Sequence, residues 1–259
     1  MRFVAHYSTR APLVALLLAT FASASPALAQ HEGHAMPHDT TVAMTMGAEE
    51  SMSDGMAVGK HLRVTRLRNA TTADSARARA IADTLRAAIA KYRDVKVAEA
   101  DGYAQFAPRV KMPKVYHFTR RASALKAAFS FDPASPTSLL YTRDSAGKFT
   151  LVGAMYTAPR QLSEDKLNER IPLSIAQWHQ HVNICVPKMR EQDRWTERGP
   201  NGRLRFGPAG TIATEEDCAT AGGRWRKQAF GWMVHANVMT SDDLGAIWKH
   251  EHGGEHMAH

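Results

Sequence analysis

The sequence predicts an α+β fold: an antiparallel sheet of about five strands packed against a long N-terminal helix, with one disulfide. Several short segments in the second half of the chain alternate apolar and polar residues with the period of two that is typical of half-buried strands. An alanine-rich segment before them carries apolar residues at helical spacing. The chain has two cysteines, which is enough for one disulfide.

Residues 1–29 have the organisation of a secretory signal peptide. Arg2 and Arg10 lie in its basic start, residues 11–22 are an apolar run too short to span a bilayer, and Ala27-Leu28-Ala29 is a small-x-small cleavage site. No second apolar stretch of membrane length follows. We therefore expect a periplasmic or secreted protein with no transmembrane segment.

The formal net charge of +8 is spread along the chain, without interleaved aromatic residues or a nucleic-acid motif. This distribution and the predicted export argue against nucleic acid as a partner. The basic residues are most simply a solvated surface, and the alternative is contact with an anionic envelope surface.

The predicted domain covers residues 71–248, between segments 30–70 and 249–259 that we expect to be disordered. Its helix runs from Thr71 to about Ala100 and has a buried stripe at Ile81, Leu85, Ile89 and Tyr92. The five predicted strands are residues 115–119, 137–143, 148–157, 178–186 and 230–238. In the third of these, alternation places Phe149, Leu151, Gly153 and Met155 on one face. Short helices are expected at about 122–131, after Ser163, at Thr214 and near Asp242, and a long polar connection occupies residues 187–213.

Cys185 and Cys218 have two interpretations. In an oxidising compartment they are expected to form a disulfide that holds the long connection beside the strand at 178–186. The alternative makes Cys185 a thiolate ligand, because alternation places it on the same face as two histidines.

Histidines on two strands are the main functional signal. Alternation puts His179 and His181 on one face of the first strand, and His235 on the polar face of the second. If the strands share a sheet, the three imidazoles converge, which predicts a metal or proton-transfer site. His117, on a short strand, is the candidate fourth metal ligand. Neighbours on the same faces suit supporting roles: Asn183 and Asn237 by orienting imidazoles through hydrogen bonds, and Met233 as a soft ligand for copper(I).

Both ends of the mature chain carry further metal-ligating side chains. The residues proposed for metal capture are His31, His34, Met36 and His38 near the start, and His250, His252 and His256 near the end. Imidazole and thioether groups together favour copper in either oxidation state, and imidazole also suits zinc. We therefore expect a copper or zinc ion, with copper favoured. The competing interpretation is that these ends are only polar and solubilising.

Common catalytic motifs are absent from the sequence, including Gly-x-Ser-x-Gly, His-Glu-x-x-His and the Walker loop. Three functions remain open. The first is a periplasmic metal-binding protein with metal-collecting tails. The second is a secreted metal- or histidine-dependent enzyme that uses the same cluster, with residues 187–213 as a lid and Glu191 or Asp193 as an acidic partner of the histidines. The third is an envelope interaction domain without a ligand.

Several blocks of residues 92–248 resemble an exported bacterial domain family of unknown function. These blocks include Tyr116-His117-Phe118, Trp178-His-Gln-His181 and Trp232-Met-Val-His235. The resemblance implies domain limits and no particular activity. Separately, the His/Met-rich N-terminal segment is similar in composition to the tails of periplasmic copper-resistance proteins, which implies copper handling.

Overall fold

The computed structural model describes residues 56–57, 60–108 and 113–249. The predicted signal peptide, the capture residues His31, His34, Met36 and His38, and the C-terminal His250, His252 and His256 lie outside this range. Among the described residues, no helix combines the length and apolar character needed to cross a membrane.

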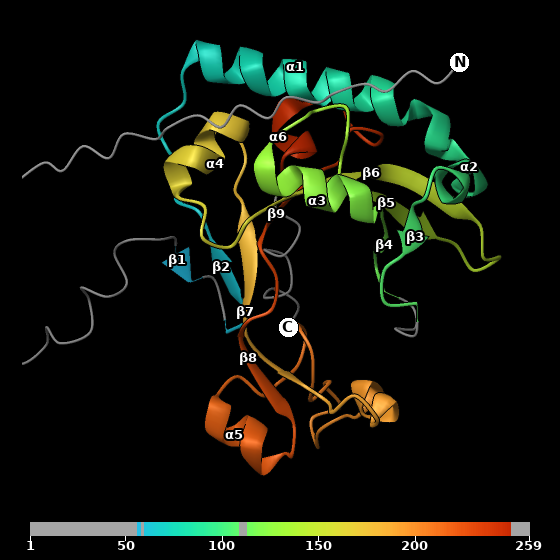
Figure 1. The fold of residues 1–259 in the computed structure, drawn as a ribbon, viewed down its shortest axis with the longest axis vertical. Coiled ribbons are helices and arrows are strands. Elements are labelled where there is room, and N and C mark those ends of the chain that lie inside the picture. The colour runs from blue at the N-terminus through green and yellow to red at the C-terminus, as the bar shows by residue number, and fades with distance from the viewer. Residues whose placement is uncertain (1–55, 58–59, 109–112, 250–259) are drawn as a thin grey trace, which may run out of the picture. The chain divides into compact units, whose positions relative to one another are not determined.

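The described residues form an antiparallel sheet in an α+β arrangement, as predicted, but the sheet is larger than five strands (Figure 1). Eight strands follow one another in the order β1-β2-β7-β9-β6-β5-β4-β3, and β8 pairs with β7 beside this path. Their bounds are β1 Met56–Ala57, β2 Leu62–Val64, β3 Ala104–Gln105, β4 Tyr116–Thr119, β5 Ser138–Arg143, β6 Phe149–Ala158, β7 His179–Val186, β8 Arg224–Gln228 and β9 Trp232–Ala236. The strands that the sequence analysis missed are β1, β2, β3 and β8.

Strand β2 corrects the predicted start of the domain. Leu62 pairs with His181 and Val64 with His179, so these residues belong to the sheet. The buried Thr65 extends the contact, because its hydroxyl accepts a hydrogen bond from the backbone N–H of Trp178 at 3.0 Å. A three-residue strand has too few positions to show alternation. A domain boundary at residue 71 therefore excludes part of the fold.

The helical segment after β2 is not continuous to residue 100 as predicted. Helix α1 spans Thr72–Ile89, a 3-10 turn covers Ala90–Arg93, and α2 spans Val95–Ala100. The N-terminus of α1 has a capping box in which Thr71 and Asp74 satisfy each other's backbone N–H groups. The break has a similar cause, because the Asp94 side chain accepts from the Lys96 N–H and begins a new helix.

One face of the sheet is covered by helices and holds the main core. Figure 1 shows α1, α3 (Arg121–Phe129), α4 (Glu164–Arg170) and α6 (Leu244–Ile247) on the same side of the central strands. Ile81 and Leu85 of α1 are buried in one cluster with aromatic residues of the sheet. These aromatic residues include Tyr141, Tyr156 and Trp232 on the strands, and Trp178 immediately before β7. Successive side chains of a strand point to opposite faces, so the residues between these core positions lie on the other face of the sheet.

The predicted disulfide is confirmed. Cys185 and Cys218 are bonded, with their Cα atoms 5.4 Å apart and a sequence separation of 33. The bridge joins β7 to α5 (Glu215–Thr220), and both cysteines pack with Phe206 and Ile212 in a small separate cluster. The alternative of Cys185 as a thiolate ligand is therefore wrong, since its sulfur is bonded to Cys218.

The long connection after β7 has its own internal structure. It contains the 3-10 turn Gln192–Thr196 and an isolated bridge between Arg198 and Leu204. Arg194 donates hydrogen bonds to both Glu191 and Glu197, and its guanidinium lies 4.5 Å above the Phe206 ring. The hydrogen bond from Arg194 lowers the pKa of Glu197. Glu191, proposed as an acidic partner of the histidines, is thus hydrogen-bonded to Arg194 instead.

Candidate metal centre

Strand pairing places the predicted histidines on the sheet face opposite the main core. Met155 of β6 is the Cα partner of His235 of β9, and Met233 of β9 is the partner of His179 of β7. Directly opposed residues of antiparallel strands point to the same face, with Cβ atoms about 5 Å apart. His117 of β4 is likewise opposite Leu140 of β5.

The four imidazoles form a row across this face. Ring centroids are 5.5 Å apart for His181 and His179, 5.2 Å for His179 and His235, and 5.4 Å for His235 and His117. At the last of these contacts the two Nε2 atoms lie 3.4 Å apart. His179 is the most enclosed member, with 1% of its surface exposed, whereas the other three are half-buried. The structure thus brings together all four residues that the sequence predicted as metal ligands, and we call them the histidine row.

The contact between His117 and His235 requires a strongly curved sheet. Strands β5 and β6 lie between β4 and β9, so in a flat sheet the two backbones would be about 14 Å apart. A bulge in the β5–β6 pair, where Leu140 faces Gly153 and Tyr141 faces Leu151, supplies a bend. Gly153 is also required by space, because a Cβ there would lie 2.0 Å from the Ala236 carbonyl oxygen.

An aromatic pair that connects the two ends of the row confirms this curvature. Phe106 follows β3 at one edge of the sheet, and Phe230 precedes β9 in its middle, yet their ring centroids are 5.9 Å apart. The Phe230 ring also lies 6.3 Å from that of His181. Both phenylalanines are partly exposed, at 54% and 41% of their surface. The backbone N–H of Phe106 donates to the His117 carbonyl at 2.7 Å, so Phe106 lies at the His117 end of the row and Phe230 at the His181 end.

The bulge also changes which residues of β6 share a face. Alternation predicted that Phe149, Leu151 and Met155 share one face of this strand. In the structure, Phe149 and Leu151 pack in the main core whereas Met155 does not. Met155 belongs to a small cluster with Leu140 and Met233, and Met155 and Met233 are 7% and 8% exposed. Met155 therefore lies on the histidine face. The predicted grouping of Met155 with Phe149 and Leu151 is wrong, because the bulge shifts the alternation.

The predicted supporting residues have different positions. Asn237 is buried, and its Oδ1 has no hydrogen-bond partner among the described residues. It follows His235 by two positions, so its oxygen remains a candidate acceptor for an imidazole N–H. Met233 lies on the histidine face, as expected.

Asn183 differs from its predicted role. Its backbone has φ of +54°, in the left-handed region that asparagine tolerates better than most residues. This conformation interrupts the alternation of β7, and the Asn183 amide donates to the Lys60 carbonyl at 3.4 Å rather than orienting an imidazole. The Asn183 carbonyl lies 2.8 Å from Nδ1 of His61.

The geometry of the row fits two ligands better than four. Two nitrogens bound to one tetrahedral ion are about 3.4 Å apart, which is the spacing between Nε2 of His117 and of His235. Within residues 56–57, 60–108 and 113–249, however, no group of three or more His, Cys, Asp or Glu side chains meets the geometry of an ion site. The rings contact their neighbours in sequence along the row instead of surrounding one point.

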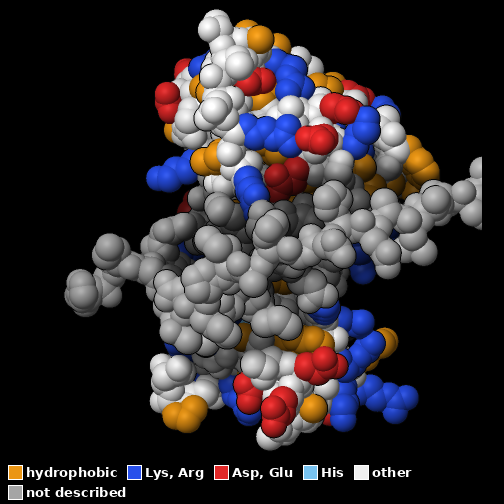
Figure 2. Space-filling view, turned by 90° about the vertical axis from the view of Figure 1, so that its left-hand side faces the viewer, with side chains coloured by type: hydrophobic (Ala, Val, Ile, Leu, Met, Phe, Trp, Pro, Cys, Tyr) orange, Lys and Arg blue, Asp and Glu red, His pale blue; other side chains and the backbone are white. Residues whose placement is uncertain are grey.

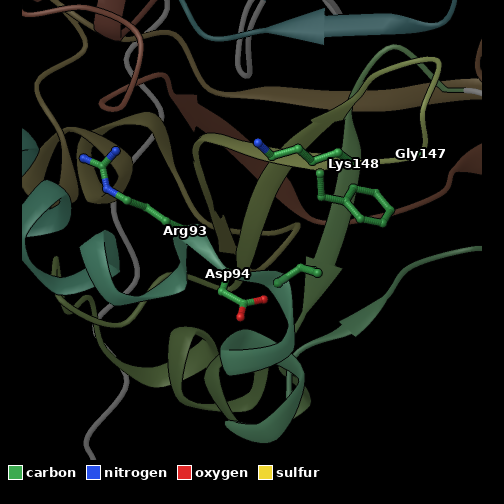
Figure 3. A pocket seen from close by; sticks show the side chains of 6 residues that line it. Arg93, Asp94, Gly147 and Lys148 are labelled. Atoms are coloured by element: carbon green, nitrogen blue, oxygen red, sulfur yellow. The ribbon is translucent and has the colours of Figure 1, made fainter.

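A separate cavity of about 500 Å³ has no histidine among the residues that line it (Figure 3). It is lined by Arg93, Asp94, Val95 and the turn residues Gly147, Lys148 and Phe149. Arg93 and Lys148 are exposed, and the Asp94 carboxylate already accepts from the Lys96 backbone N–H.

The surface charges visible in Figure 2 are mixed. Lysine and arginine side chains alternate with aspartate and glutamate over the described residues on that side. Elsewhere among the described residues, opposite charges form ion pairs, such as Arg86 with Asp83 and Lys166 with Glu169. This side therefore offers no uniformly basic patch, and contact with an anionic envelope surface stays a prediction.

Comparison with known proteins finds no similar protein. No family model, no curated protein and no solved structure matches this chain. The resemblance of residues 92–248 to an exported family, and that of the N-terminal segment to copper-resistance tails, therefore stay predictions.

Proposed function

We propose that this chain is an exported metal-binding protein whose ordered site is the histidine row, His117, His179, His181 and His235. Copper is favoured as the ion and zinc is the alternative. The observation that carries the proposal is the 3.4 Å spacing between Nε2 of His117 and Nε2 of His235. These residues come from strands separated by two others, so the contact depends on the curvature of the whole sheet.

The choice of four imidazoles, rather than aliphatic side chains, on this face of the sheet supports a functional role. An imidazole brings less apolar surface to a sheet face than an aliphatic side chain of similar size, because two of its ring atoms are polar nitrogens. Alternate positions of the same strands carry tryptophan, valine and alanine on the other face, so these strands accommodate apolar residues. Four imidazoles in one row are therefore better explained by a ligand than by packing.

Export is supported by the predicted leader and by the disulfide, since disulfides persist mainly in oxidising compartments. In such a compartment the terminal histidines and methionines would collect ions at low affinity and raise the local concentration near the row. This tail function belongs to residues outside the described range and is part of the proposal.

The proposal is tested by metal titration of the full-length chain and of two sets of variants. The first variant is His117→Gln/His235→Gln. The second replaces the histidines and methionines of residues 31–52 and 250–259 by glutamine and leucine, and is called the tail-substituted chain. We expect the tail-substituted chain to retain one tightly bound ion, and the double variant in that background to lose it.

His61→Gln provides the matched control. His61 lies in the turn before β2, and its ring nitrogens contact the backbone carbonyls of Asn183 and Gly210, each at 2.8 Å. Its replacement should leave the bound ion in place, and circular dichroism verifies that each variant is folded. If the tail-substituted chain binds no ion, or if the double variant binds as well as its parent, the row is not a metal site.

A further inference from the structure

Two methionines lie on the same face of the sheet as the histidine row. Met155 is directly opposite His235, and Met233 is directly opposite His179. Met233 also precedes His235 by two positions on β9, and therefore points to the same side. His235 is the imidazole in contact with both His117 and His179. Both thioethers thus lie beside the central pair of the row.

These methionines are not part of the helix-covered core. They form a separate buried cluster with Leu140, the residue opposite His117. A third methionine, Met239, packs instead against the main core. Met239 lies in the turn after β9, so methionines near this strand have two kinds of neighbour: imidazoles for Met155 and Met233, and the residues of the main core for Met239.

The strands that carry the row contain no acidic residue. None of β4, β5, β6, β7 and β9 includes an aspartate or glutamate, and the one cysteine among them is held in the disulfide. The ligands available from these strands are therefore neutral imidazoles and thioethers. The cost of moving an ion into a low-dielectric site rises with the square of its charge, so neutral ligands tolerate a monovalent ion far better than a divalent one.

We propose that the row selects copper(I), held around His235 by imidazole nitrogens and by the thioether sulfurs of Met155 and Met233. This inference rests on the proposed metal-binding function and specifies its ion. Thioether sulfur is a soft ligand that favours copper(I), whereas zinc in proteins is bound by imidazole, thiolate or carboxylate. Both ligand softness and the absence of compensating charge on these strands select the same ion.

The test compares Met155→Leu, Met233→Leu and their combination, all in the tail-substituted full-length chain. Leucine keeps the volume and apolar character of methionine, so the fold should be retained. Copper(I) affinity is measured without oxygen by competition with bicinchoninate, and zinc affinity by competition with a chromogenic zinc chelator. Met239→Leu is the matched control, because it makes the same change in the turn after β9, where the side chain packs against the main core.

We expect the double variant to lose roughly a hundredfold in copper(I) affinity, about 2.8 kcal/mol of binding free energy. Zinc affinity should change less than threefold, and Met239→Leu should change neither. X-ray absorption of the copper-loaded parent should show copper–sulfur scattering that the double variant lacks. Equal copper(I) affinity in the parent and the double variant would overturn the role of the methionines while leaving the histidine site intact. Absence of both copper(I) and zinc binding in the parent would instead remove the site itself.

Discussion

The two faces of the sheet are made by alternate residues of the same strands, and their chemistry differs sharply. In β9, Trp232, Val234 and Ala236 lie in the helix-covered core, whereas Met233 and His235 lie on the histidine face. The first face packs against α1 and aromatic partners, and the second carries imidazoles, thioethers and hydroxyls. This division allows the strands to be stabilised from one side while the other side carries the residues of the proposed metal site.

The largest expected effect concerns the helix-covered face. Trp178 is completely buried there, and Trp178→Ala should lower the free energy of unfolding by about 3–5 kcal/mol, because it leaves a cavity in a packed core. Urea denaturation measures this loss. Phe129→Ala is the control, since Phe129 is 83% exposed and its loss should change stability by no more than about 0.5 kcal/mol.

The same variant tests whether the faces are independent. Molecules of Trp178→Ala that remain folded should bind metal with the affinity of the parent. A large change in metal affinity would show that the two faces are coupled through β7, where Trp178 immediately precedes His179.

A smaller loss of stability is expected from a substitution at Gly153, in the bulge of the β5–β6 pair. Gly153→Ala places a Cβ against the backbone of β9, at 2.0 Å from the Ala236 carbonyl oxygen. We expect a loss of about 1–3 kcal/mol in unfolding free energy, together with weaker metal binding, because β6 must move away from β9. Gly199→Ala is the control, since the nearest atom to a Cβ there is 3.4 Å away. Weaker stability with unchanged metal affinity would separate the bulge from the geometry of the row.

Much of the histidine row could be predicted from alternation alone. The period of two in residues 178–186 and 230–238 is sufficient to place His179, His181 and His235 on polar faces. What the sequence did not reveal is the order of the strands, because β4 and β9 are distant both in sequence and in the sheet. Their histidines meet only because the sheet bends.

The residues that were misplaced share a physical cause. Alternation is a local rule, and it fails wherever the backbone leaves the extended conformation. The bulge at Gly153 moved Met155 away from Leu151, and the left-handed backbone of Asn183 removed its amide from the histidine face. Both sites carry residue types that tolerate such conformations, yet glycine and asparagine are common in ordinary strands and loops as well.

The smallest expected effect is on the histidine face. His235→Leu, measured with a chelator present, should change the free energy of unfolding by less than about 1 kcal/mol, because leucine replaces a half-buried imidazole of similar volume. Metal binding should be lost at the same time. A loss of stability as large as that of Trp178→Ala would mean that the row is a second core, and would weaken the case for a ligand.

The disulfide makes a covalent ring of the chain between β7 and α5. Cys185 and Cys218 enclose the 3-10 turn and the glycine-containing turns of residues 187–213. A protease that cuts once inside this ring cannot release either piece, since the bridge still ties them together. Under denaturing conditions, such a nicked molecule would migrate as one species until a reductant is added. The piece that carries His117, His179 and His181 would stay covalently linked to the piece that carries His235.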